Sequence, residues 1–208
     1  MEGGDRGRGR LPGGERRFEG VAAGRPLRLG IVGCGGLVRG RHLPVLRDLP
    51  EIAVVAVADL DPRAAADVAA AFDVPRRYAT AEELAADPEL DAVAVCTPPS
   101  AHVGAAIAAL EAGKPVFVEK PIAVSLDDAD RLLEHEARSP MPALMGFNLR
   151  WHRLLLRARR LVQEGELGWV HCMVSTFTDP LLRRELPAWR SRRDHGGGVL
   201  LDRAVHHF

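Results

Sequence analysis

The chain has 208 residues, of which 47% are hydrophobic, so it is long enough to bury a sizeable core. Its 28 Lys and Arg residues balance 28 Asp and Glu residues, and this zero formal net charge gives no electrostatic reason to expect a nucleic-acid or membrane partner. Because the three cysteines are widely spaced and no apolar run is long enough for a membrane span or a secretory signal, we expect a cytoplasmic protein that binds no metal.

Residues 1–26 are rich in Gly and Arg and contain few apolar side chains. Such a segment cannot compensate the entropy lost on ordering, so the sequence predicts a disordered tail. The Arg-Gly spacing is also found in RNA-binding segments, but the interleaved acidic residues favour a solvated extension, or a start codon placed too early.

The next stretch, residues 27–40, has the sequence LRLGIVGCGGLVRG. Its glycines, Gly33, Gly35 and Gly36, allow backbone amides to approach a ligand, and a helix that begins here would direct its N-terminus at an anion. A plain tight turn would use the same glycines. Asp59 ends the following apolar run at the offset of a ribose-binding carboxylate, which favours a dinucleotide site and NAD over NADP.

Apolar runs and helical patterns alternate along residues 28–147. The predicted strands are 28–32, 51–58, 77–78, 91–97, 115–119 and 142–147, and the predicted helices are 37–49, 63–72, 80–86, 100–113 and 126–137. Buried strands that alternate with helices are typical of an α/β fold with a doubly wound parallel sheet. Pro44 is expected to kink or interrupt the first helix, because a proline removes a helical hydrogen bond.

Ligands of such sheets bind beyond the carboxyl ends of the strands. Gly33, Asp59, Thr97 and Lys120 all follow predicted strands, so we expect them at one edge of the sheet. A lysine in the position of Lys120 can hydrogen-bond a substrate hydroxyl, although a lysine that only extends its amine into solvent fits the sequence equally well.

A second structural region begins near residue 149. We predict an amphipathic helix over 150–164 and a strand over 169–177, followed by three glycines and a last helix. Asp202 and His206 are four residues apart and would share one face of that helix. A carboxylate beside an imidazole prepares a general base, although pairs with this spacing are often plain surface contacts.

Several motifs together resemble the glucose-fructose oxidoreductase, inositol dehydrogenase and rhizopine catabolism (Gfo/Idh/MocA) family. They are GIVGCGG at 30–36, Asp59, TPPSAH at 97–102, EKP at 119–121, GFNLRW at 146–151, WR at 189–190 and GGGVLLDRAVH at 196–206. The resemblance implies an NAD(P)-binding Rossmann domain over 27–148 and an α+β substrate domain that begins at 149. It also implies hydride transfer between NAD, or alternatively NADP, and a hydroxyl of a sugar, cyclitol or related polyol.

The resemblance assigns roles to individual residues. Catalysis falls to Lys120, Asp202 and His206; the cofactor site to Gly33, Gly35, Gly36, Leu37, Asp59, Thr97, Pro98, His102, Glu119 and Lys120; and the substrate site to Lys120, Asn148, Arg190, Asp202 and His206. Within these sets His206 is the acid/base, Lys120 orients the substrate hydroxyl, and the peptide bond between Lys120 and Pro121 is cis.

Two departures from the family pattern stand out. Val38 replaces the third small residue of the glycine loop, and its bulk is expected to hold the helix farther from the first strand. The chain ends just after His206, where family members continue, so we expect a substrate domain that is incomplete and exposes apolar surface, favouring a homo-oligomer.

Two alternative functions stay open: a dinucleotide-binding sensor or subunit without catalysis, and NAD-dependent glycoside cleavage or epimerisation on the same fold.

Overall fold

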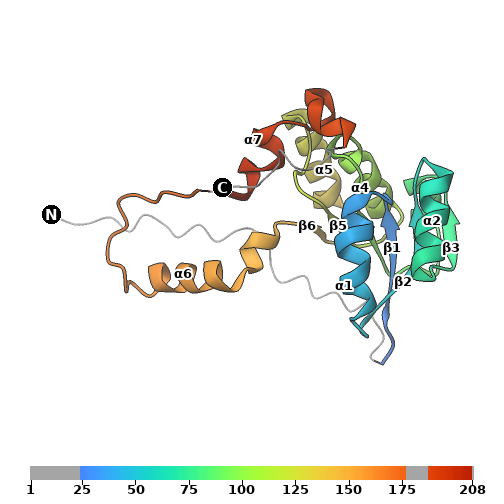
Figure 1. Ribbon diagram of the computed structural model, residues 1–208, viewed down its shortest axis with the longest axis horizontal. Coiled ribbons are helices and arrows are strands. Elements are labelled where there is room, and N and C mark those ends of the chain that lie inside the picture. The colour runs from blue at the N-terminus through green and yellow to red at the C-terminus, as the bar shows by residue number, and fades with distance from the viewer. Residues whose placement is uncertain (1–23, 177–186, 208) are drawn as a thin grey trace.

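A computed structural model describes residues 24–176 and 187–207 of the chain (Figure 1). Its centre is a six-stranded sheet in the order β3-β2-β1-β4-β5-β6, in which every neighbouring pair is parallel. The strands are β1 (Leu27–Val32), β2 (Ile52–Ala58), β3 (Arg76–Tyr78), β4 (Ala92–Val95), β5 (Val116–Val118) and β6 (Ala143–Met145). The predicted strand order along the chain and the predicted α/β class are confirmed.

Helices connect the strands and continue beyond them. They are α1 (Leu43–Arg47), α2 (Pro62–Phe72), α3 (Ala81–Ala85), α4 (His102–Glu111), α5 (Leu126–Arg138), α6 (Arg153–Gln163) and α7 (Val199–Asp202). Short 3-10 turns lie at Pro99–Ala101, Asn148–Trp151, Ala188–Ser191, Arg193–His195 and Ala204–His207. No helix in the described ranges has the length and apolar character needed to cross a membrane.

Both faces of the sheet are covered, as a doubly wound fold requires. Alternate residues of a strand point to opposite faces, so Val93 and Val95 of β4 pack with α3, α4 and α5, while Ala94 packs with α1 and α2. The two buried clusters are almost wholly aliphatic, which explains why the strands were recognisable as continuous apolar runs.

Side-chain caps start the helices where the sequence predicts them. Thr80 Oγ1 accepts a hydrogen bond from the Glu83 amide at 3.1 Å, and the Glu83 carboxylate accepts one from the Ala79 amide at 2.9 Å. Ser125 Oγ caps α5 by accepting a hydrogen bond from the Asp128 amide at 3.2 Å. Each cap satisfies an amide that has no partner further back in its helix.

The helix after the glycine loop is interrupted, as the proline predicts. Residues 36–47 are helical throughout, but Val38–His42 is a π-helical stretch and Pro44 stands in the first turn of α1. The π-helical stretch accommodates the proline, because the hydrogen bonds change register just before it: the Leu43 amide donates to the Val38 carbonyl, five residues back. Val38 is fully buried in the cluster beneath this helix.

The region after β6 differs from the prediction. The strand predicted over 169–177 is wrong as far as the structure describes it, since residues 169–176 form no strand and Phe177 lies outside the described residues. Trp169 is 83% exposed and Met173 is 82% exposed. A strand needs a neighbour for its backbone hydrogen bonds, and no described segment provides one. In Figure 1 the preceding helix α6 projects away from the sheet, and it contains no buried residue.

The last predicted helix is also interrupted. It ends at Asp202, and a separate 3-10 turn carries His206. Asp202 and His206 therefore do not lie on one helical face. The prediction that a four-residue spacing pairs them on that face is wrong.

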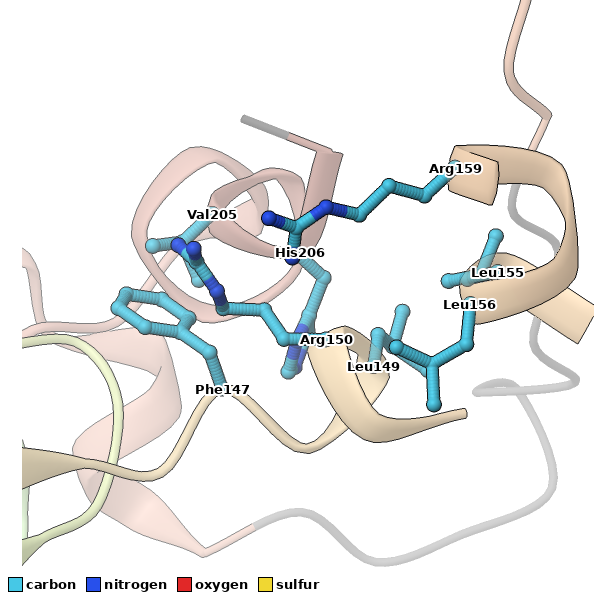
Figure 2. Close-up of a pocket in the computed structure, with 8 residues that line it drawn as sticks. All are labelled: Phe147, Leu149, Arg150, Leu155, Leu156, Arg159, Val205 and His206. Carbon is cyan, nitrogen blue, oxygen red and sulfur yellow. The ribbon is translucent and has the colours of Figure 1, made fainter. Parts of the chain in front are cut away.

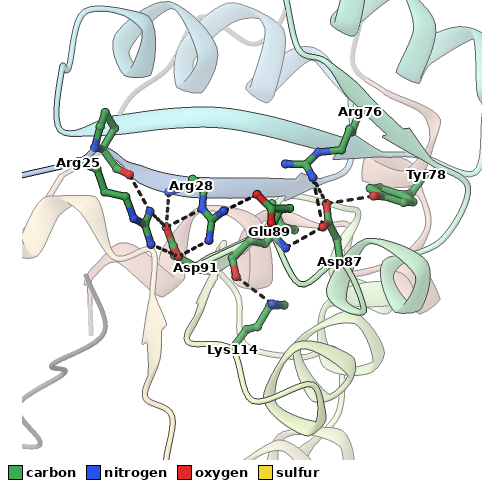
Figure 3. A network of polar contacts seen from close by, with 10 residues as sticks. Arg25, Arg28, Arg76, Tyr78, Asp87, Glu89, Asp91 and Lys114 are labelled. Atoms are coloured by element: carbon green, nitrogen blue, oxygen red, sulfur yellow. Dashed lines mark hydrogen bonds and ion pairs between the residues drawn. The ribbon is translucent and has the colours of Figure 1, made fainter. Parts of the chain in front are cut away.

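A polar network ties the amino ends of the strands together (Figure 3). The Asp91 carboxylate accepts hydrogen bonds from the Arg25 guanidinium at 2.6 and 2.8 Å and from the Arg28 amide at 2.8 Å. These donors, the Arg25 guanidinium foremost, hold the pKa of Asp91 well below its usual value. Anchored structure thus begins at Arg25, inside the predicted tail, of which residues 1–23 lie outside the described part.

Replacing Gly33 by Ala tests the glycine loop. Gly33 has φ +100°, and a Cβ there would lie 2.7 Å from the Cys96 carbonyl oxygen, whereas a Cβ at Gly36 meets nothing within 4 Å. We expect Gly33→Ala to lower the free energy of unfolding by about 1–3 kcal/mol and Gly36→Ala to leave it nearly unchanged. Chemical denaturation of both variants checks this, and equal losses would contradict it.

Candidate functional site

The predicted ligand-binding residues do gather at one edge of the sheet. Val32 is in register with Ala58 and with Val95, and Val95 is in register with Val118. The residues that follow these strand ends are therefore neighbours, although up to about 90 positions separate them in the chain. They comprise the glycine loop, Asp59, Thr97 and the Glu119-Lys120 pair.

The glycine loop is shaped by Asp59. The Asp59 carboxylate accepts hydrogen bonds from the Cys34 amide at 2.7 Å and from the Asp61 amide at 2.9 Å. The space above Gly35 and Gly36 is open, and the amides of the first turn, residues 36–38, have no partner further back in the helix. Leu37 is 46% exposed at the same place. This open cradle of amides fits the pyrophosphate of a dinucleotide.

Thr97 supplies an unpaired polar atom at the same edge. Its Oγ1 is buried and has no hydrogen-bond partner among the described residues. Buried hydroxyls are rarely left unpaired, so this atom is suited to a ligand that hydrogen-bonds it. The next residue, Pro98, is exposed beside it.

His102 lies beneath the surface and not on it. It is 1% exposed, and its ring nitrogens Nδ1 and Nε2 lie 2.7 Å from the Pro121 carbonyl and 2.9 Å from the Thr97 carbonyl. The structure does not expose its ring to a ligand, and it holds two site segments together instead. Burial lowers the pKa of His102 despite the two carbonyls, so the ring favours its neutral form.

Lys120 is held by the end of the chain. Its Nζ donates hydrogen bonds to Asp202 Oδ1 at 3.0 Å and to the Asp202 carbonyl at 2.5 Å. The Lys120-Pro121 peptide is cis, as the resemblance implies. Asp202 is 8% exposed, and its other carboxylate oxygen lies 3.5 Å from Arg190 Nε and 3.4 Å from Arg203 Nε. Three predicted residues, Lys120, Asp202 and Arg190, thus meet around one carboxylate.

Close packing of glycines brings this segment to the sheet edge. A side chain at Gly196 would collide with the ring of Pro99, and one at Gly197 would collide with the Arg190 carbonyl. The absence of a side chain at Gly196 and Gly197 therefore permits this close approach of the backbone.

His206 belongs to the same electrostatic environment. Burial lowers the pKa of His206 first, the positive charge of Lys120 lowers it further, and the nearby carboxylates of Glu119 and Asp202 oppose them. Its Nδ1 is buried without a hydrogen-bond partner among the described residues. A neutral imidazole with a vacant nitrogen can accept a proton at neutral pH.

Asn148 is the predicted residue that stands apart. It is exposed at the start of a 3-10 turn, and within the described ranges its side chain forms no hydrogen bond with Lys120 or Asp202.

Sequence reasoning missed two residues that support the site. His42 Nε2 lies 3.0 Å from Glu119 Oε1, and the same carboxylate accepts a hydrogen bond from the Lys120 amide at 3.2 Å. Arg39 donates to the Cys34 carbonyl at 2.8 Å and so braces the glycine loop. The interruption at Pro44 was the available signal for His42, because π-helical turns are frequent at functional sites.

Two of the three cysteines lie below this edge, Cys34 buried and Cys96 half-buried. Burial raises the pKa of Cys34 to about 12 and also raises the pKa of Cys96, so both thiols favour the protonated form. Within residues 24–176 and 187–207 no cluster of three potential metal ligands occurs.

Comparison with known proteins extends this picture. Residues 27–147 match a family model described as "Oxidoreductase family, NAD-binding Rossmann fold", and residues 155–208 match the "GFO/IDH/MocA C-terminal domain". The chain is 29% identical over 184 residues to myo-inositol 2-dehydrogenase of Thermotoga maritima, and this match covers 88% of the chain and 53% of that protein.

A second sequence relative and a solved structure show the same family likeness. The chain is 34% identical over 191 residues to dTDP-3,4-didehydro-2,6-dideoxy-alpha-D-glucose 3-reductase of Saccharopolyspora spinosa, covering 88% of the chain and 56% of the relative. A crystal structure of an oxidoreductase from Thermotoga maritima superposes with a TM-score of 0.74 at 29% identity, covering 88% of the chain and 58% of that structure. The chain spans about half the length of the curated relatives it matches.

The pH dependence of stability tests how much His102 contributes to the free energy of unfolding. The folded state holds the pKa of His102 below its ordinary value of 6.5, so below that pH the unfolded state binds more protons and stability falls. We expect His102→Gln to cost about 1–3 kcal/mol near pH 7.5, because a flexible amide does not reproduce the packing and hydrogen bonding of the buried ring between the two carbonyls. The variant should also lose less further stability than the unaltered chain between pH 7.5 and pH 5.5.

Thermal unfolding at several pH values measures this difference. His135→Gln is the matched control, since His135 is only partly buried on α5. If the unaltered chain and His102→Gln have the same pH slope, the buried imidazole is not the source of acid sensitivity.

Proposed function

This chain belongs to the Gfo/Idh/MocA family of NAD-binding oxidoreductases, and from that premise we propose that it transfers a hydride between a nicotinamide cofactor and a hydroxyl of a sugar, cyclitol or related polyol. The observation that carries the proposal is the Lys120–Asp202 pair, which lies at the sheet edge that also bears the glycine cradle. A fixed ammonium, a neutral imidazole and an anion cradle at one edge are the groups that such a reaction needs.

The residues at the edge fit a dinucleotide. The amides above Gly35 and Gly36 would receive the pyrophosphate, and the unpaired Thr97 hydroxyl offers a further hydrogen bond. Asp59 keeps acceptor capacity beyond the two amides it already binds, so it can accept from a ribose hydroxyl. A carboxylate there repels a 2′-phosphate, and we therefore propose NAD as the cofactor.

Side chains of this protein would carry out the proton transfer that accompanies hydride transfer. Lys120 can donate a hydrogen bond to the substrate hydroxyl and stabilise the alkoxide, while Asp202 restricts the position of the ammonium. His206, kept neutral by burial and by Lys120, can take the hydroxyl proton. When bound, the nicotinamide supplies the hydride acceptor or donor.

The names of the relatives support a polyhydroxylated substrate. One is a myo-inositol dehydrogenase and another reduces a deoxysugar nucleotide. Both names describe a carbonyl and hydroxyl interconversion on a ring with several oxygen substituents, which is why we assign the broad class of sugars and cyclitols.

Cofactor selectivity provides the first test. We expect NADH to bind at least about tenfold more tightly than NADPH, because Asp59 would face the extra phosphate. Gly36→Ala should weaken NADH binding without loss of stability, since its methyl group would occupy the open cradle. Fluorescence titration measures both effects, and tighter binding of NADPH would reject the role of Asp59.

Lys120 provides the second test. Lys120→Met should lower turnover by about 10²-fold to 10⁴-fold while the affinity for NADH changes little. Lys114→Met is the matched control, since Lys114 donates to the Leu90 carbonyl at the opposite edge of the sheet. Turnover of a polyol panel is followed by NADH formation, and values are corrected for the folded fraction of each variant. Unchanged turnover in Lys120→Met would remove Lys120 from catalysis, and cofactor binding without turnover of any polyol would favour a non-catalytic protein.

A further inference from the structure

A cavity of about 260 Å³ adjoins His206 (Figure 2). It is bounded by the segment after β6, by α6 and by the last 3-10 turn. The residues that line it are Phe147, Leu149, Arg150, Leu155, Leu156, Arg159, Val205 and His206. Neither Arg150 nor Arg159 belongs to the candidate site described above.

The ionisable side chains that line this pocket are all basic. Its lining has two guanidinium groups and one imidazole but, within the described part of the chain, no carboxylate. Arg150 and Arg159 form no ion pair with any described residue. The arginines nearby behave differently: Arg190 lies 3.5 Å from Asp202, and Arg192 donates to Asp194 at 2.7 Å.

The two arginines line the same cavity although they come from different elements. Figure 2 shows Arg150 reaching from the 3-10 turn and Arg159 reaching from α6, both toward the turn that carries Val205 and His206. Like charges directed into one space repel each other, and a bound anion relieves that repulsion. Each guanidinium also presents a planar fork of donors that matches the oxygens of a carboxylate or a phosphate.

The remaining walls suit a sugar ring. Phe147, Leu149 and Leu155 offer apolar surface against which the C–H face of a ring can pack. Because His206 lines the same cavity, a ligand whose charged group meets the arginines keeps a ring hydroxyl close to the proposed base. Anion recognition and proton transfer are thus available to one ligand.

We propose that this pocket binds an anionic group of the substrate, a carboxylate or a phosphate, so that the substrate is an acidic sugar derivative and not a neutral polyol. The inference rests on the proposed function, because it places the substrate beside His206. It adds Arg150 and Arg159 as the residues that determine specificity for the negative charge.

Binding of three sugars that differ only at C6 tests this. D-glucuronate carries a carboxylate there, D-glucose 6-phosphate carries a phosphate, and D-glucose carries a neutral hydroxyl. Calorimetry on the 208-residue chain, with and without NADH, should show at least one of the two anionic sugars binding about tenfold or more tightly than glucose. Which anionic sugar binds distinguishes a carboxylate from a phosphate substrate.

Charge variants then locate the effect. Arg150→Gln with Arg159→Gln should reduce the preference for the anionic sugar to less than twofold. Arg157→Gln with Arg160→Gln removes the same net charge from exposed positions of α6 that do not line the cavity, and it should keep the preference. Circular dichroism verifies that both variants are folded.

Three results would overturn the proposal: no preference for either anionic sugar, an unchanged preference in the Arg150 and Arg159 variant, or an equal loss in the control. The readout is binding and not turnover. A failure of hydride transfer would therefore refute the proposed function while leaving the anion site intact, and loss of the anion preference alone would leave the proposed function standing.

Discussion

The contact between Lys120 and Asp202 determines how the rest of the site is arranged. It joins residues 82 positions apart and attaches the last turn of the chain to the edge of the parallel sheet. Burying the Asp202 carboxylate removes it from water, and it is compensated by three cationic side chains, those of Lys120, Arg190 and Arg203. Burial is the main cause of the lowered pKa of His206 nearby, and the positive charge of Lys120 adds to it against the opposing carboxylates of Glu119 and Asp202.

Much of the sheet could be predicted because each strand is locally unambiguous. Runs such as residues 92–95 are apolar on both sides, so they must be buried on both faces, and that requirement leads to a parallel sheet between helices. The glycine loop and Asp59 could be placed at one edge by the same logic, since parallel strands end together. Caps at Thr80 and Ser125 depend on a few adjacent residues and were equally accessible.

The predictions that were wrong concern segments whose structure depends on tertiary contacts, which a local sequence pattern does not encode. Residues 169–176 have the composition of a strand, yet a strand forms only where another strand can receive its hydrogen bonds. Asp202 and His206 have helical spacing, but the helix ends between them, and it is the contact of Asp202 with Lys120 that attaches this segment to the site. His102 occupies a motif position that the family resemblance associates with the cofactor, and only the fold reveals that its ring is enclosed by two carbonyls.

The contact between His42 and Glu119 gives the site a common frame. His42 belongs to the π-helical stretch that follows the glycine loop, and Glu119 precedes the catalytic candidate Lys120. The π-helical stretch and the Glu119-Lys120 segment are consequently braced against each other through one side-chain bridge, with Phe117 packed edge-on against the imidazole. Their separation is a property of the sheet and its first crossover, so the diversity of substrates in such a scaffold can arise in the segments beyond β6 without disturbing the distance over which the reaction takes place.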